Sequence, residues 1–394
     1  MLKEHVVLSM DLAFMSPFAL PRTPKREFFS RGVWLGLDRL EGLVFWNPEA
    51  VINHCGLVLG PMGCGKTTML KTLMYRARKM LGLPVWVIDP AGEYVEAVEA
   101  CGGRVYNMAN VKVNPMLLCG QTPTARWASV CDSLKYAVGL SDDEAGLVQE
   151  ALEALYSEAG VKPEDPETWV DDRLKGVTVS GLYFKLRSML ESAPEGTLDH
   201  ALLRSLIPKL TKLAAGAHAF NRTDIVPHEL LNETVCFNLK ELAVDLRKLV
   251  VWTLLEQLYD HMYYAGKLSD RLKLMVFIDE AHLFIKPEVR YVAGRAVPVE
   301  PPLFRHMRLM RKFGVGYWAC THVPEDVPDE VWKTVGTIVL FGSTERDYLA
   351  FCAEKLNLTN EDVQNMMFFG RGEAFIKARG EPRPAYLKVV PQRL

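Results

Sequence analysis

Nine consecutive residues have the types and the spacing of a phosphate-binding loop. Residues 60–68 read Gly-Pro-Met-Gly-Cys-Gly-Lys-Thr-Thr, which fits the pattern G-x-x-x-x-G-K-[ST]. Glycines let such a loop curl until its N–H groups point at phosphate oxygens. Lys66 would then bridge the β- and γ-phosphates of ATP, and Thr67 would ligate Mg²⁺. The predicted nucleotide-binding residues of this loop are Gly60, Pro61, Met62, Gly63, Cys64, Gly65, Lys66, Thr67 and Thr68.

Two adjacent carboxylates end an apolar run much further along the chain. Residues 272–278 are mostly apolar and lead directly into Asp279 and Glu280. A carboxylate at the carboxyl end of a core strand can hold Mg²⁺ beside Thr67, and Glu280 is suited to act as the base for the attacking water. Many strands end in acids that only cap the next helix. Together with the phosphate loop, however, the pair predicts ATP hydrolysis with Lys66 and Glu280 as catalytic residues and Thr67 and Asp279 at the metal.

Polar residues also follow two other predicted strands. Asp89 ends the run 84–89 and Glu93 lies one turn later, so both are candidates for nucleotide contact, because ligands gather at the carboxyl ends of parallel strands. The alternative is an Asp-Pro-Ala-Gly turn with Glu93 capping the next helix. His322 ends the run 316–322 and is a candidate for sensing the γ-phosphate, or else a strand-end histidine without a catalytic role.

The stretch 286–312 is rich in proline and in basic residues, with aromatic residues among them. A flexible basic loop suits contact with a nucleic-acid backbone, which makes Lys286, Arg290 and Arg295 candidate DNA contacts. A solvated surface loop leading into a helix explains the same composition. An arginine that reaches a neighbouring subunit's nucleotide is also expected. The candidates are Arg308, Arg311, Arg371, Arg379 and Arg383, and the sequence leaves the choice open, with Arg311 and Arg371 carried forward as catalytic candidates.

Apolar runs on both sides of the loop predict the elements that position these residues. An apolar strand at 55–59, a helix at 67–82 and a strand at 84–89 form the βαβ signature of a parallel sheet. Further strands are expected at 234–239, 272–280, 316–322 and 337–342, and a strand at 373–376 is expected to close the sheet at an edge. Apolar residues at helical spacing predict that 125–230 is an all-helical insertion.

The predicted organisation is therefore an α/β core with a mostly parallel sheet, formed by residues 51–124 and 231–394. Residues 1–50 would be a docking segment with a hairpin of residues 33–36 and 43–46, packed on the sheet.

Composition limits the kinds of partner. The 394 residues carry a formal net charge of −2, so contact with nucleic acid would have to come from local basic patches. The eight Cys residues include no C-x-x-C pair, and neither they nor the His residues other than His322 suggest a ligand cluster. No apolar run is long enough to cross a bilayer.

Several motifs, in order, resemble the HerA–FtsK superfamily of ring-shaped DNA-pumping ATPases. They are residues 60–68, 87–94 (Val-Ile-Asp-Pro-Ala-Gly-Glu-Tyr), 277–282 (Phe-Ile-Asp-Glu-Ala-His), 311–316 and 370–376. The Asp-Pro-x-Gly-Glu-Tyr element and the long helical insertion are similar to the conjugation ATPases of type IV secretion systems and to their archaeal DNA-import relatives. The lead-in at 15–21 and 32–47 resembles the same group.

This resemblance implies a RecA-like core that works as a homo-hexamer and is a monomer when isolated. It implies ATP between subunits, DNA in a central channel, and secretion or pilus partners at the inner face of the cell membrane, with the chain itself cytoplasmic. His322 departs from the family, which usually has Gln there. Three rival functions remain open: a motor for pilus or channel assembly on protein substrates, a HerA-type DNA-repair translocase, and a structural module that binds ATP but barely cleaves it.

Overall fold

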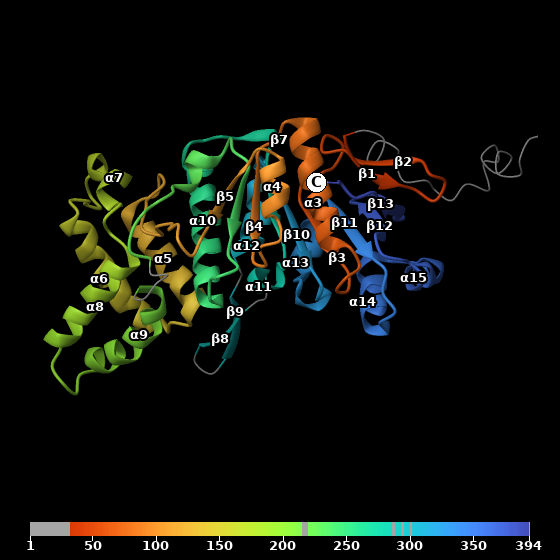
Figure 1. Ribbon diagram of the computed structural model, residues 1–394. Helices are drawn as coiled ribbons and strands as arrows, with labels where there is room; N and C mark the ends of the chain where they lie inside the picture. Colours follow the sequence, from red (N-terminus) through yellow and green to blue (C-terminus); the bar gives the residue numbers. More distant parts are fainter. Residues whose placement is uncertain (1–31, 215–219, 286–287, 293–294, 300–301, 394) are drawn as a thin grey trace, which may run out of the picture.

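The computed structural model describes residues 32–393 except 215–219, 286–287, 293–294 and 300–301 (Figure 1). Its main sheet has eleven strands in the order β2-β1-β13-β12-β11-β3-β10-β7-β4-β6-β5. The strands from β11 to β5 pair in parallel, which confirms the predicted α/β class with a mostly parallel sheet. They are β11 (Thr337–Phe341), β3 (Gly56–Leu59), β10 (Phe313–Thr321), β7 (Ser269–Ile278), β4 (Val85–Asp89), β6 (Val235–Asn238) and β5 (Arg104–Asn107).

The central strands are mostly apolar because both faces of the sheet are covered. Successive side chains of β3 point to opposite faces, so Leu57 and Leu59 enter one core and Val58 enters the other. Helix α3 (Lys66–Leu81) packs on the Val58 face through residues at helical spacing, including Met69 and Leu73. It ends at Gly82, whose φ of 68° is the left-handed conformation that favours glycine. Helix α4 (Val95–Ala100) covers the same face.

The remaining strands extend the sheet in antiparallel fashion. They are β12 (Glu373–Ala378), β13 (Ala385–Val389), β1 (Val33–Leu37) and β2 (Leu43–Trp46). The β1–β2 pairing confirms the predicted hairpin, which continues the sheet instead of packing on its face. The prediction that 373–376 closes an edge is wrong: β12 lies between β11 and β13, and the edges are β2 and β5. Residues 1–31 of the predicted docking segment lie outside the described part of the chain.

Every regular element described between β5 and β6 is helical, as expected for 125–230. These elements lie together beyond the β5 edge, at the left of Figure 1. They are α5 (Pro123–Val138), α6 (Asp142–Glu158), η1 (Pro166–Thr168), α7 (Asp171–Leu174), α8 (Val179–Ser192), α9 (Leu198–Ala214) and η2 (Pro227–Leu230). Thr122 and Ser141 accept backbone N–H bonds at the starts of α5 and α6, which explains where these helices begin. No helix within the described ranges has the length and apolar character needed to cross a membrane.

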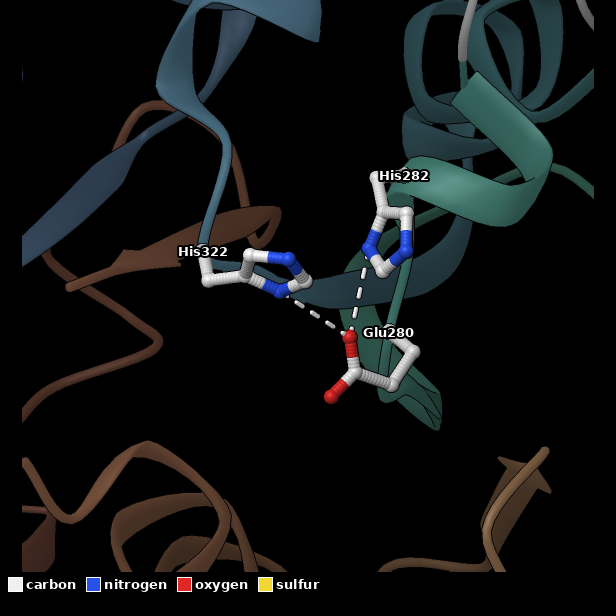
Figure 2. A group of neighbouring side chains, drawn as sticks. All are labelled: Glu280, His282 and His322. Carbon is white, nitrogen blue, oxygen red and sulfur yellow. Dashed lines mark ion pairs between the residues drawn. The ribbon is translucent and has the colours of Figure 1, made fainter. Parts of the chain in front are cut away.

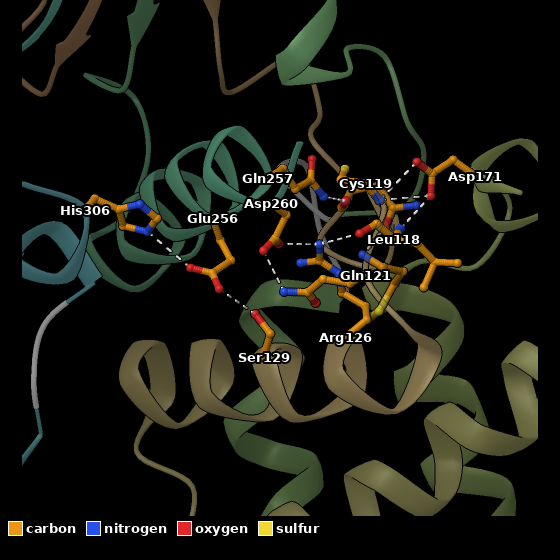
Figure 3. Close-up of polar contacts among 12 residues, drawn as sticks. Leu118, Cys119, Gln121, Arg126, Ser129, Asp171, Glu256, Gln257, Asp260 and His306 are labelled. Atoms are coloured by element: carbon orange, nitrogen blue, oxygen red, sulfur yellow. Dashed lines mark hydrogen bonds and ion pairs between the residues drawn. The ribbon is translucent and has the colours of Figure 1, made fainter. Parts of the chain in front are cut away.

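A buried polar network joins helix α10 (Val244–Tyr264) to its neighbours (Figure 3). Arg126 on α5 donates to Oδ2 of Asp260 at 2.7 Å, and Gln121 donates to Oδ1 at 2.6 Å. One turn away, Glu256 accepts from Arg305 and contacts Nε2 of His306 at 3.1 Å, both on α12 (Pro302–Leu309). The network therefore fixes α12 and the helical insertion to the same helix.

The described residues of the basic stretch form strands and helices where a loop was expected. Strands β8 (Glu288–Val292) and β9 (Arg295–Val299) pair antiparallel as a separate ribbon that leads into α12. Arg290 and Arg295 lie on these strands, and Lys286 lies outside the described residues. The remaining short elements are α11 (His282–Ile285), η3 (Met310–Lys312), η4 (Pro324–Asp326), α13 (Asp329–Thr334), α14 (Arg346–Leu356) and α15 (Asn360–Met367).

Candidate nucleotide-binding site

The phosphate loop joins the carboxyl end of β3 to the start of α3, as the motif predicts. Gly63 and Gly65 have φ of 78° and 114°, conformations that favour glycine. A Cβ atom on Gly60 would lie 2.6 Å from Cβ of Phe341 and 2.7 Å from Sγ of Cys64, so only glycine fits there. Met62 at the tip is 78% exposed, which leaves the loop open to solvent.

Lys66 lies within the curl of the loop. Its Nζ donates to the carbonyl oxygens of Gly60 at 2.8 Å and Pro61 at 2.9 Å, and the residue is buried. No side chain caps the start of α3, so its first N–H groups and the positive end of its dipole face the loop. A buried ammonium beside uncapped N–H groups is suited to bind phosphate.

Thr67 and Asp279, which are 212 positions apart, meet at the end of β7. The Thr67 hydroxyl donates to Oδ2 of Asp279 at 2.9 Å, and the hydroxyl of Tyr94 donates to the same oxygen at 3.0 Å. Oδ1 accepts the backbone N–H of Glu280 at 2.9 Å. A hydroxyl and a carboxylate placed beside a phosphate loop fit Mg²⁺, which prefers oxygen ligands.

Asp89 supports this arrangement from the end of β4. Its carboxylate accepts the backbone N–H groups of Gly92, Glu93 and Tyr94 at 2.8, 3.1 and 2.8 Å. Asp89 is fully buried, whereas Glu93 is exposed. These bonds favour the alternative in which Asp89 stabilises the turn after β4, and this turn orients Tyr94 toward Asp279. A direct contact of Asp89 or Glu93 with the nucleotide stays a prediction. The sequence does not identify Tyr94 as a site residue, because only the pairing of β4 with β7 brings it to Asp279.

Glu280 lies next to Asp279 and faces two histidines (Figure 2). Its backbone has φ of 47°, an uncommon value for a residue with a side chain. Oε2 lies 3.2 Å from Nδ1 of His282 and 3.2 Å from Nδ1 of His322. Burial lowers the pKa of His282, partly opposed by the Glu280 carboxylate. The expectation that His residues other than His322 form no cluster is therefore wrong, since the parallel pairing of β7 and β10 brings their carboxyl ends together.

The two arginine candidates lie at opposite ends of the parallel strands, Arg371 near the carboxyl ends and Arg311 near the amino ends. Gly372 donates its N–H to the carbonyl of Cys64 at 2.9 Å, so the neighbouring, exposed Arg371 lies beside the phosphate loop of its own chain. Arg311 precedes the amino end of β10, whereas the loop follows the carboxyl end of the adjacent β3. Arg311 is thus separated from Lys66 of the same chain, and the roles of both arginines stay predictions.

Comparison with known proteins agrees with this geometry. One relative is the DNA import protein CedB of Sulfolobus acidocaldarius, with 23% identity over 98% of this chain; the chain spans only 60% of the length of that relative. The structure of VirB4 of Thermoanaerobacter pseudethanolicus matches with a TM-score of 0.72 and 21% identity, over 92% of this chain and 96% of the other. The plasmid coupling protein TrwB in complex with ADP and Mg²⁺ matches with a TM-score of 0.60 and 14% identity, over 94% and 92% of the two chains.

Two family models together match residues 44–385 of the chain. Residues 246–385 match the HerA-like helicase C-terminal family. Residues 44–258, more than half of the chain, match the central domain of helicase HerA. The chain belongs to the HerA helicase family.

Proposed function

We propose that this chain is an ATP-hydrolysing motor domain of a machine that transfers DNA, as in conjugation or DNA import. The observation that carries the proposal is the 2.9 Å hydrogen bond between Thr67 and Asp279, because it joins the phosphate loop to the acid-bearing strand. Lys66 holds the phosphates, Thr67 and Asp279 hold Mg²⁺, and Glu280 accepts the proton of the attacking water. An Mg²⁺ ion held by Thr67 and Asp279 would supply positive charge beside the phosphate oxygens.

DNA as the substrate is supported by the relatives. CedB is described as a DNA import protein, and TrwB as a plasmid coupling protein. A net charge of −2 supplies no general attraction for DNA, so the basic stretch would provide the contacts through Lys286, Arg290 and Arg295. The working state would be a hexamer with ATP between subunits and with partners at the cell membrane.

A second candidate is a motor that assembles a pilus or secretion channel on protein substrates, and the near-neutral charge favours it. A DNA-repair translocase of the HerA type is a further possibility in which the substrate is also DNA. Measuring ATP turnover with and without DNA separates the two substrates. DNA is supported as the substrate if it stimulates ATP turnover and if this stimulation is lost when Arg290 and Arg295 are both changed to Ala. The control Arg204→Ala on α9 should keep the stimulation. ATP turnover that does not respond to DNA supports the assembly function.

The catalytic assignment has its own test. Lys66→Ala is expected to abolish turnover, and Glu280→Gln is expected to bind ATP while lowering turnover by about 10²–10⁴-fold. Nucleotide binding and phosphate release measured on the same preparations separate the two steps. Full turnover in Glu280→Gln would remove Glu280 from its assigned role as the base.

A further inference from the structure

Glu280, His282 and His322 present three ligand atoms to one small space. They come from the turn after β7, the first residue of α11 and the turn after β10 (Figure 2). Oε2 of Glu280 lies 3.2 Å from each of the two Nδ1 atoms. One ligand atom from each of the three residues lies within 4.8 Å of the other two. The carboxylate is 36% exposed and the imidazoles 22% and 27%, so the three side chains lie near the protein surface.

The histidine nitrogens lie at ion-pair distance from the carboxylate, but neither contact has the geometry of a hydrogen bond. Within the described part of the chain, neither Nδ1 atom has a hydrogen-bond partner, although both are shielded from solvent. Unpaired buried nitrogens are uncommon because they lose their bonds to water without replacement.

The spacing matches that of metal ligands. Bonds of about 2.0–2.2 Å from Zn²⁺ to nitrogen and oxygen place neighbouring ligand atoms of a tetrahedral site about 3.3 Å apart. The two distances of 3.2 Å between carboxylate oxygen and nitrogen agree with this value. We propose that Glu280, His282 and His322 form a binding site for a divalent transition ion such as Zn²⁺, with a fourth position open to solvent.

This site differs in chemistry from the magnesium site next to it. Imidazole nitrogens bind Zn²⁺, Co²⁺ and Ni²⁺ well, whereas Mg²⁺ prefers the oxygens that Thr67 and Asp279 offer. A transition ion would therefore bind here in the presence of excess Mg²⁺. It would also occupy the carboxylate of Glu280, so Zn²⁺ should inhibit ATP turnover reversibly. That consequence rests on the proposed function, while the binding itself does not.

The direct test is a Co²⁺ titration without nucleotide, followed by its visible absorption. We expect the intense visible bands of a four-coordinate ion, saturating at one per chain and displaced by Zn²⁺. His282→Asn and His322→Asn should each weaken binding at least about tenfold. His200→Asn on α9 is the matched control and should leave binding unchanged. Cysteine ligation is recognised by its near-ultraviolet charge-transfer band and by its loss in Cys64→Ser.

The outcomes separate the site from the proposed function. Lys66→Ala, which should not turn over ATP, is still expected to bind Co²⁺ like the unchanged chain. If ATP turnover is absent but the histidine-dependent bands are present, the proposed function fails and the metal site stands. If the bands are missing, or are equally strong in correctly folded His282→Asn and His322→Asn, the metal site is wrong. Where turnover is present, the Zn²⁺ concentration for half-inhibition should rise at least about tenfold in His282→Asn.

Discussion

The hydroxyl of Tyr94 donates a hydrogen bond to Oδ2 of Asp279 at 3.0 Å, across 185 positions of sequence. Tyr94 is fully buried, and burial together with the Asp279 carboxylate raises its pKa well above the ordinary value, so the hydroxyl stays a donor. The backbone N–H of Tyr94 is in turn held by Asp89. The end of β4 therefore determines which lone pairs of Asp279 remain for Thr67 and a metal ion.

Tyr94→Phe tests this relationship. The variant leaves Oδ2 of Asp279 with one donor fewer, and we expect a loss of about 1–2 kcal/mol in the free energy of unfolding. The Mg²⁺ concentration for half-maximal turnover should change as well. Denaturant unfolding and Mg²⁺ titration measure the two effects. Tyr75→Phe on α3 is the control, and equal effects in the two variants would contradict a special role for Tyr94.

A methyl group on the first glycine of the loop should disrupt nucleotide binding. In Gly60→Ala the new Cβ would lie 2.6 Å from Cβ of Phe341, so the loop must shift, at a cost of about 1–3 kcal/mol in unfolding free energy. Gly146→Ala is the opposite case: no atom lies within 4 Å in the middle of α6, and a stabilisation of about 0.5–1 kcal/mol is expected. Thermal unfolding and ATP-analogue binding distinguish them, and unimpaired binding in Gly60→Ala would contradict the tight fit.

The buried Glu256 should make the fold sensitive to acid. Burial raises its pKa, but His306 and Arg305 more than compensate and lower it from 4.5 to about 2. Because the folded pKa lies below the unfolded one, the stability from Glu256 is complete above about pH 4.5 and is lost as the pH falls toward 2.

Glu256→Gln is the corresponding variant. It leaves Arg305 in α12 without its anionic partner, and we expect it to unfold about 3 kcal/mol more easily at neutral pH. Its unfolding free energy should also depend less on pH between 4.5 and 2 than that of the unchanged chain. Glu153→Gln, at an exposed position of α6, is the control; a parallel pH dependence in all three proteins would refute the argument.

Mixing inactive chains tests the two arginines. Arg311 is far from its own loop, so Arg311→Ala chains mixed with Lys66→Ala chains should regain turnover at interfaces that combine an intact lysine with an intact arginine. Arg371 lies beside its own loop, so Arg371→Ala mixed with Lys66→Ala should regain none. Loss of a true arginine finger costs about 10³–10⁵-fold in turnover. Recovery in the Arg371 mixture alone would reverse the assignment.

Features that depend on neighbouring residues in the chain could be predicted from the sequence. The loop at 60–68 is recognisable because its conformation depends on glycines at fixed spacing, and the central strands because they are mostly apolar. The helical character of 125–230 followed from periodicity in the same way. The sequence did not reveal two short strands of the main sheet, β5 and β13, which have only four and five residues and are partly exposed, so neither gives a continuous apolar run. Nor did it reveal β8 and β9, which lie in the stretch expected to be a loop.

The order of the strands and the contacts between distant side chains depend on the tertiary structure and could not be predicted from the sequence. That β12 is internal, that Tyr94 reaches Asp279, and that His282 and His322 share Glu280 all depend on which strands become neighbours. A linear pattern specifies the period of an element and the types of its side chains. Which strands become neighbours is determined by the need to bury both faces of the sheet. The resulting order places the phosphate loop, the acids and the histidines together at the carboxyl ends of the parallel strands.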